Sequence, residues 1–174
     1  MRYAEIKNYD IANGPGVRVT LFVSGCTHRC EGCFNEVTWD FNYGSTFDED
    51  AEKKIIADLE PDYIAGLTLL GGEPLEYTNW QVLLPLVRTV KQKYPQKDIW
   101  CYTGYRFEED ILDCFCTQWE DMREFLSYID VIVDGEFILA RKNIGLQFRG
   151  SDNQRIIQVQ ESLRNGRTVL WIGS

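Results

Sequence analysis

The stretch VRVTLFVSGCTHRCEGC, from Val17 to Cys33, joins an apolar, β-branched run directly to three closely spaced cysteines. Residues 17–23 predict a buried strand, in which only Arg18 and Thr20 interrupt the apolar pattern. Three and then two residues separate the cysteines, so the loop is able to aim all three thiols inward. Sites in α/β proteins lie beyond the carboxyl ends of parallel strands, which is where these cysteines are expected to fall.

The rest of the chain alternates between helix and strand patterns. Helices are predicted at residues 45–60, 80–90 and 108–128, and strands at 65–71, 97–104, 129–137, 154–159 and 168–173. Ser45 or Thr46 is expected to cap the first helix, Pro85 to kink the second, and a break is expected near Cys116 in the third. The alternation predicts an α/β fold with a largely parallel sheet, in a single domain spanning residues 1–174.

Composition and charge narrow the classes of partner. The chain has 174 residues, 44% of them hydrophobic, and a formal net charge of −9. An acidic protein is a poor match for nucleic acid or for anionic lipid, so neither is expected as a partner. The charged N-terminus does not resemble a signal peptide, and no apolar run is long enough to span a membrane. We therefore expect a cytoplasmic protein whose six cysteines are reduced.

The cysteine triplet allows several interpretations. Structural zinc needs four ligands, and the loop supplies Cys26, Cys30 and Cys33, with His28 as an awkwardly placed fourth. Disulfides are disfavoured in a reducing compartment, and incidental thiols do not require clustering. An iron–sulfur cluster held by three thiolates leaves one iron free to bind a substrate or cofactor. The residues alone favour this cluster while leaving the zinc-stabilised binding module open.

The C-x3-C-x2-C spacing after a first strand resembles the signature of radical SAM enzymes. The resemblance implies an incomplete (β/α) barrel and a [4Fe-4S] cluster on the three cysteines. It also implies S-adenosylmethionine (SAM) on the open iron, cleaved reductively to a 5′-deoxyadenosyl radical. This chain differs from many members in having Gly32 before the third cysteine and Phe34 after it. Backbone near that position contacts adenine in the family, which makes Gly32, Cys33 and Phe34 candidate cofactor residues.

Two further strand ends carry candidate cofactor residues. The segment GGEP, Gly71 to Pro74, resembles the radical SAM segment that binds the methionyl amino group, although a tight turn is the competing interpretation. In that role Gly71 and Gly72 bring backbone close to the ligand. The Glu73 carboxylate is then available to pair with the ammonium, and Pro74 ends the segment. Thr103, in the sequence Thr-Gly-Tyr after the third predicted strand, is the last candidate.

The segments NGPGVRVTLFVSGC and FNEVTWD resemble the activases of glycyl radical enzymes. The short chain and the sequence GCFN favour the subgroup that acts on anaerobic ribonucleoside-triphosphate reductase. That resemblance implies the large, glycyl-radical subunit of this reductase as partner and a reductant such as flavodoxin. Another glycyl radical protein as substrate, or a small molecule as in 7-carboxy-7-deazaguanine synthase-like enzymes, stays open.

The remaining distinctive residues have no assigned role. Arg18 is expected to be an exposed strand residue, and His28 and Arg29 ordinary solvated loop residues. The loop containing Gly150, Ser151 and Asn153 is equally compatible with a place near the site and with a simple turn. Cys101, in an apolar predicted strand, is expected to be a core residue. Cys114 and Cys116 have no clear partner residues, so no second metal site is expected there.

Overall fold

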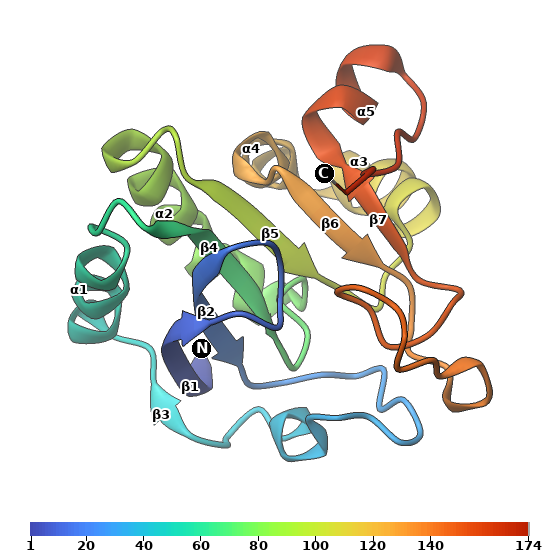
Figure 1. Cartoon of the computed structure of the whole chain (residues 1–174), viewed down its shortest axis with the longest axis horizontal. Coiled ribbons are helices and arrows are strands. Elements are labelled where there is room, and N and C mark those ends of the chain that lie inside the picture. The colour runs from blue at the N-terminus through green and yellow to red at the C-terminus, as the bar shows by residue number, and fades with distance from the viewer. Residues whose placement is uncertain (174) are drawn as a thin grey trace.

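The computed structural model describes residues 1–173 as one seven-stranded sheet with helices, and its elements are drawn in Figure 1. The strands are β1 (Arg2–Asp10), β2 (Val17–Val23), β3 (Ser45–Thr46), β4 (Ile64–Gly71), β5 (Asp98–Tyr102), β6 (Val131–Asp134) and β7 (Arg155–Gln158). The α-helices are α1 (Glu49–Asp58), α2 (Tyr77–Lys93), α3 (Cys116–Gln118), α4 (Glu120–Tyr128) and α5 (Val159–Asn165). Short 3₁₀ helices cover Glu36–Trp39 and Leu139–Arg141, and a π-helical segment covers Phe107–Phe115.

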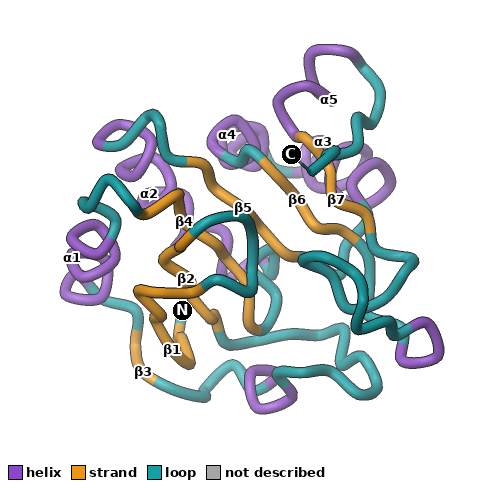
Figure 2. The backbone as a smooth tube through the Cα atoms, viewed as in Figure 1, coloured by secondary structure: helices purple, strands orange, loops and turns teal. Residues whose placement is uncertain are grey.

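The sheet has the order β3-β1-β2-β4-β5-β6-β7. Its four central strands, β2, β4, β5 and β6, run parallel, whereas β1, β3 and β7 add antiparallel pairs at the two edges. The prediction of an α/β fold with a parallel sheet is therefore confirmed for the sheet centre. Because the central strands run in one direction, the loops that follow them gather beyond the carboxyl ends of these strands (Figure 2).

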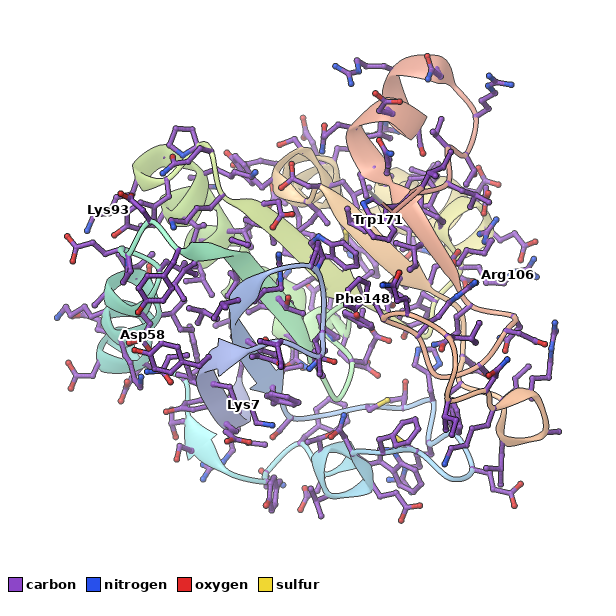
Figure 3. The ribbon with its side chains drawn as sticks, viewed as in Figure 1. Lys7, Asp58, Lys93, Arg106, Phe148 and Trp171 are labelled. Atoms are coloured by element: carbon purple, nitrogen blue, oxygen red, sulfur yellow. The ribbon has the colours of Figure 1, made fainter. Side chains whose placement is uncertain are left out.

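The two faces of the sheet are covered differently. On the outer face, residues such as Leu21, Leu69 and Ile132 pack with the helices into the main hydrophobic core. On the inner face, Trp100 and its strand neighbours form a second cluster against Phe148 and Trp171, which Figure 3 labels. Trp171 belongs to the C-terminal segment, so this segment and the loop after β6 close the inner face in place of a helix.

Helix α2 shows the predicted apolar spacing directly, since Trp80, Leu83, Leu84, Val87 and Val90 are all buried. The helix continues through Pro85 to Lys93. At 17 residues it is the longest helix within residues 1–173. Within residues 1–173, no helix combines the length and the apolar composition needed to cross a bilayer.

Two predictions of local structure are wrong. The first helix is capped by Asp48, whose carboxylate accepts a hydrogen bond from the Ala51 amide at 3.0 Å. Ser45 and Thr46 instead pair with β1 as strand β3. Residues 168–173 form one isolated bridge to β7, between Leu170 and Ile157, instead of a strand. The interruption expected near Cys116 in the third helix is confirmed: the π-helical segment ends at Phe115, and the helix breaks at Trp119.

The strand β1 has no counterpart in the sequence prediction. Its residues alternate between half-buried and exposed positions, with charged Glu5 fully on the exposed side. The charges that make the N-terminus look irregular are those expected on a strand near the sheet edge, where they discourage pairing with other chains.

Candidate functional site

One cavity of about 480 Å³ lies beyond the carboxyl ends of β2, β4, β5 and β6. The ends of β2, β4 and β5 contribute residues that the sequence had singled out. The cavity is lined by Cys26, Cys30, Cys33 and Phe34 from the loop after β2, by Gly71, Gly72 and Glu73 after β4, and by Thr103 after β5. The parallel register of the sheet therefore brings these predicted site residues together, although they are up to 77 positions apart in the chain (103 − 26).

The two glycines after β4 let that strand end approach the cysteine loop closely. A side chain on Gly72 would stand 2.6 Å from the Gly25 carbonyl oxygen, and Gly71 adopts a positive φ of 109°. Backbone hydrogen bonds join the two segments: the Gly72 amide donates to Val23, and the Glu73 amide donates to Gly25, each at 2.8 Å. The glycine pair is thus required by the packing of the loops themselves.

The Glu73 carboxylate is buried and already engaged. Its Oε1 accepts a hydrogen bond from the Leu75 amide, and its Oε2 accepts one from the Gly104 amide, both at 2.8 Å. Its Oε2 also lies 3.1 Å from Nε2 of His28. Glu73 therefore ties the end of β4 to the end of β5 and to the cysteine loop. Pro74, which follows it, is buried and does not line the cavity.

His28 is not the solvated loop residue that the sequence suggested. Its side chain is 10% exposed and reaches Glu136, beyond β6, through a 2.8 Å contact at Nδ1. Its ring packs edge-on against Tyr105 at a centroid distance of 4.4 Å. Burial opposes the imidazolium charge, but the carboxylates of Glu73 and Glu136 outweigh it and raise the pKa of His28 to about 9. Nothing in the local sequence signals this role, because both carboxylates are distant in the chain.

The three loop cysteines are free thiols, which would have to lose their protons to bind a metal. Burial raises the pKa of Cys26 to about 11, and burial together with the Glu136 charge raises the pKa of Cys30. The Asn35 amide donates a hydrogen bond to the Cys33 sulfur at 3.4 Å. Three soft sulfur donors on one cavity wall suit an iron–sulfur cluster, whose binding would displace the thiol protons. Within residues 1–173, no three Cys, His, Asp or Glu side chains converge tightly enough for a single metal ion.

The segment after β6 covers the cysteine loop from the other side. A side chain on Gly32 would meet Leu139 at 2.9 Å, so the glycine before the third cysteine lets this segment approach. Phe34 is 65% exposed and packs against Phe137 at a centroid distance of 5.3 Å. Gly150 also lines the cavity and lies close to both rings. The loop around Gly150 is therefore placed beside the candidate site.

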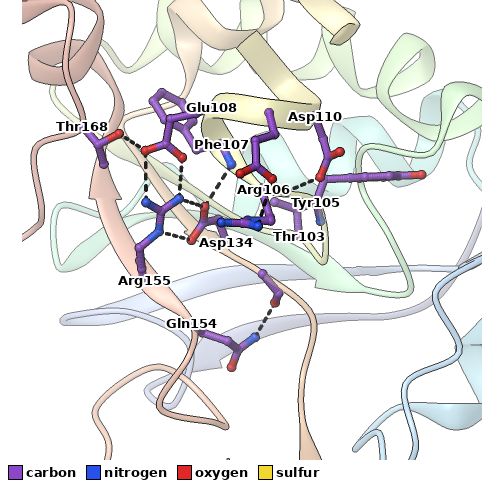
Figure 4. A network of polar contacts seen from close by, with 12 residues as sticks. Thr103, Tyr105, Arg106, Phe107, Glu108, Asp110, Asp134, Gln154, Arg155 and Thr168 are labelled. Atoms are coloured by element: carbon purple, nitrogen blue, oxygen red, sulfur yellow. Dashed lines mark hydrogen bonds and ion pairs between the residues drawn. The ribbon is translucent and has the colours of Figure 1, made fainter. Parts of the chain in front are cut away.

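A network of charges braces the base of this covering segment, as Figure 4 shows. Arg155 on β7 bonds to Asp134 at the end of β6 and to Glu108 in the π-helical segment, where Nη1 lies 3.0 Å from Oε1. Thr168 from the C-terminal segment donates to Glu108. The Arg155 hydrogen bond is the main reason that the pKa of Glu108 falls to about 2. The network joins four segments next to Gly135 and Glu136.

Three other sequence assignments can be compared with the structure. Arg18 is fully buried, so its assignment as an exposed strand residue is wrong. It faces the inner side of the sheet, where strand neighbours supply polar partners that one-dimensional patterns do not reveal. Cys101 is fully buried in the main core, as expected. Cys114 and Cys116 belong to no metal-binding group within the described residues.

Comparisons with known proteins agree with this geometry. A family model described as a 4Fe-4S single cluster domain matches residues 12–157, which contain all three loop cysteines. The anaerobic ribonucleoside-triphosphate reductase-activating protein of Haemophilus influenzae is 47% identical over 158 residues, covering 90% of this chain and 97% of that protein. The proteins of the same name from Enterobacteria phage T4 and Escherichia coli K12 are 45% and 43% identical, covering 90% and 88% of this chain and 93% and 96% of theirs.

The family model favours an iron–sulfur cluster over zinc at the cysteine loop. The relatives confirm the resemblance to the activase subgroup, because they match almost from end to end. This chain belongs to the family of anaerobic ribonucleoside-triphosphate reductase-activating proteins and contains a 4Fe-4S single cluster domain.

Proposed function

We propose that this chain generates a glycyl radical on the large subunit of anaerobic ribonucleoside-triphosphate reductase by a radical SAM reaction. The observation that supports this most directly is the single cavity shared by the three thiols and the glycine-rich end of β4. When bound, a [4Fe-4S] cluster and SAM supply the chemistry: one electron from a reductant such as flavodoxin cleaves the sulfonium, and the 5′-deoxyadenosyl radical removes hydrogen from glycine.

The chain's own residues hold and orient these groups. Cys26, Cys30 and Cys33 are the cluster ligands in this proposal, because they are the thiols that line the cavity. Backbone of Gly71, Gly72 and Glu73, which line the cavity, would face the methionyl group of SAM, with Pro74 behind them. The proposed adenine side would be formed by Cys33, Phe34 and Thr103, which line the cavity, next to Gly32, which does not; Phe34 is 65% exposed.

Glu73 has a more restricted part in this proposal than its charge suggests. Two backbone amides and His28 already surround its carboxylate, which is buried. A ligand ammonium would therefore share the carboxylate with His28 instead of pairing with it alone. We infer that the main contribution of Glu73 is to fix the backbone after β4, where its own carbonyl also accepts hydrogen bonds from the Glu76 amide and the Asn79 side chain.

The proposed architecture is the incomplete (β/α) barrel of radical SAM enzymes, formed by residues 1–174 as a single domain. Four parallel strands with helices on their outer face support it. An open barrel suits a macromolecular substrate, because a polypeptide segment carrying the reacting glycine has to enter the cavity. Free thiols in the described chain are consistent with work in the reducing cytoplasm.

Anaerobic reconstitution tests the proposal in two steps. The wild-type chain is expected to bind about four irons and, with a strong reductant, to convert SAM to 5′-deoxyadenosine. Addition of the reductase large subunit is then expected to produce a glycyl radical that electron paramagnetic resonance (EPR) detects. Replacing Cys26, Cys30 or Cys33 by Ala should abolish both reactions, whereas Cys114→Ala, outside the cavity, should support them normally.

The two steps separate the alternatives. A colourless protein that retains one zinc ion would reject the radical SAM assignment altogether. An iron-loaded protein that cleaves SAM but forms no radical on the reductase would point to another glycyl radical protein or to a small-molecule substrate.

A further inference from the structure

His28 joins the ends of four strands at one point beside the cavity. It lies in the loop after β2, between the first two candidate cluster ligands. Its Nε2 lies 3.1 Å from Glu73 after β4, and its Nδ1 lies 2.8 Å from Glu136 after β6. Its ring packs against Tyr105 after β5. These contacts span 108 positions of the chain between His28 and Glu136.

The socket holds a flat ring with a carboxylate near each nitrogen: Nδ1 is hydrogen-bonded to Glu136, and Nε2 lies within ion-pair distance of Glu73 without forming a hydrogen bond. A side chain on Gly104 would stand 2.7 Å from Cδ2 and Nε2 of His28, so the ring occupies the space that this glycine leaves. Glu73 is held in place by the amides of Leu75 and Gly104. On the other side, Asn153 donates to the backbone carbonyl of Glu136 at 2.8 Å. Imidazole is the side chain that offers two nitrogens at opposite edges of a rigid plane.

We propose that His28 is a positioning residue that fixes the cysteine loop, and with it the spacing of Cys26 and Cys30, against the ends of β4 and β6. Because Glu73 belongs to the segment that faces SAM in the proposed function, the same contact aligns the cluster ligands with the cofactor segment. This inference rests on the proposed function for its cofactors. The fixation of the loop itself is a property of the protein without them.

Removing the imidazole should loosen the loop at both ends. His28→Leu introduces an apolar side chain of similar size and leaves Glu73 and Glu136 without their shared partner. His28→Gln keeps one amide donor and should restore part of the contact. Arg29→Gln is the matched control, because Arg29 is an exposed cation in the same loop and has no ion-pair partner among the described residues.

The first measurement uses the protein without cluster. Hydrogen–deuterium exchange of the amides of residues 25–33 should be at least about tenfold faster in His28→Leu than in wild type, since exchange reports local opening. The Gln variant should lie between them, and Arg29→Gln should exchange like wild type. Equal exchange in His28→Leu and wild type would overturn the inference.

The second measurement uses the reconstituted protein. Loss of iron to a chelator should be about 10–100-fold faster in His28→Leu, as for other residues that support metal ligands. The EPR spectrum of its reduced cluster should broaden, and its dissociation constant for SAM should rise because the cysteine loop is no longer fixed against the segment after β4. Normal cluster retention, spectrum and SAM affinity would contradict the inference while leaving the proposed function intact. If the wild-type chain binds no iron, the proposed function fails, and the exchange measurement still tests whether His28 fixes the loop.

Discussion

Two cationic side chains, Arg18 and His28, connect strands at opposite ends of the same sheet. Near the amino end of β2, the Arg18 guanidinium donates to the Thr68 hydroxyl at 2.7 Å and to the Leu67 carbonyl at 3.0 Å, and pairs with Asp98. Its side chain has no exposed surface. Beyond the carboxyl end, His28 connects loops, and its ring lies beside the cavity with 10% exposure.

Arg18 and His28 differ in the part of the structure that each one connects. Arg18 fills the interior where the inner face is sealed, so its hydrogen bonds serve the fold alone. His28 stands where the strands have ended and the loops need an additional connection to hold a fixed geometry around an open cavity. The comparison predicts that changes at the Arg18 end reduce stability most, whereas changes at the His28 end act mainly on the site.

The largest expected effect on stability is that of Arg18→Leu. The substitution leaves two buried acceptors, the Leu67 carbonyl and the Thr68 hydroxyl, without their donor, and removes the cation that faces the 38% exposed Asp98. We expect the free energy of unfolding to fall by about 1–3 kcal/mol for each buried acceptor left unsatisfied. Urea unfolding of the protein without cluster measures this. Lys7→Leu, which removes a half-exposed cation from β1, should change stability by no more than about 0.5 kcal/mol. Equal effects of the two substitutions would refute the comparison.

A smaller effect is expected for Gly104→Ala. The new methyl group would stand 2.7 Å from the His28 ring, so the ring has to leave its socket or the strand end has to move. Overpacking of this kind costs about 1–3 kcal/mol. The same urea titration should show this loss, and the variant should share the faster iron loss of His28→Leu. Gly145→Ala, where the nearest atom is 3.2 Å away, serves as the control. If Gly104→Ala is as stable as wild type, the socket is less rigid than its geometry indicates.

The smallest effect is expected at the half-exposed network around Arg155. The pKa of Glu108 is about 2, below its ordinary value of 4.5, so its stabilising contribution is complete above about pH 4.5 and is lost as the pH falls toward 2. Solvent screens this pair, whose side chains are 33% and 41% exposed, so the contribution should not exceed about 1 kcal/mol. Urea unfolding should show that Glu108→Gln is less stable than wild type at pH 6 by this amount. The difference should shrink at pH 3, and a difference that grows on acidification would reverse the assigned sign.

The regular features of the fold were predictable because they depend on local patterns. The strand at residues 17–23, the strand that ends in two glycines and the apolar stripe of α2 each follow from spacing within a short window. Parallel strands then place their carboxyl ends at one edge, so the meeting of Cys26, Gly71 and Thr103 around one cavity also followed. The failures, such as the start of α1 and the strand expected at 168–173, occur where edge pairing or packing overrides local propensity.

The sequence by itself determined which motif follows which strand, the thiol chemistry of Cys26, Cys30 and Cys33, and the place of these cysteines beyond the carboxyl ends of the parallel strands. It did not reveal that Arg18 is sealed inside or that His28 bridges Glu73 and Glu136. Only the tertiary structure decided these roles, because the partners of Arg18 and His28 lie up to 80 and 108 positions away and act through distance and burial. A hydrogen bond or an ion pair depends on atoms brought within a few ångströms of each other, and that proximity exists only after the sheet has formed.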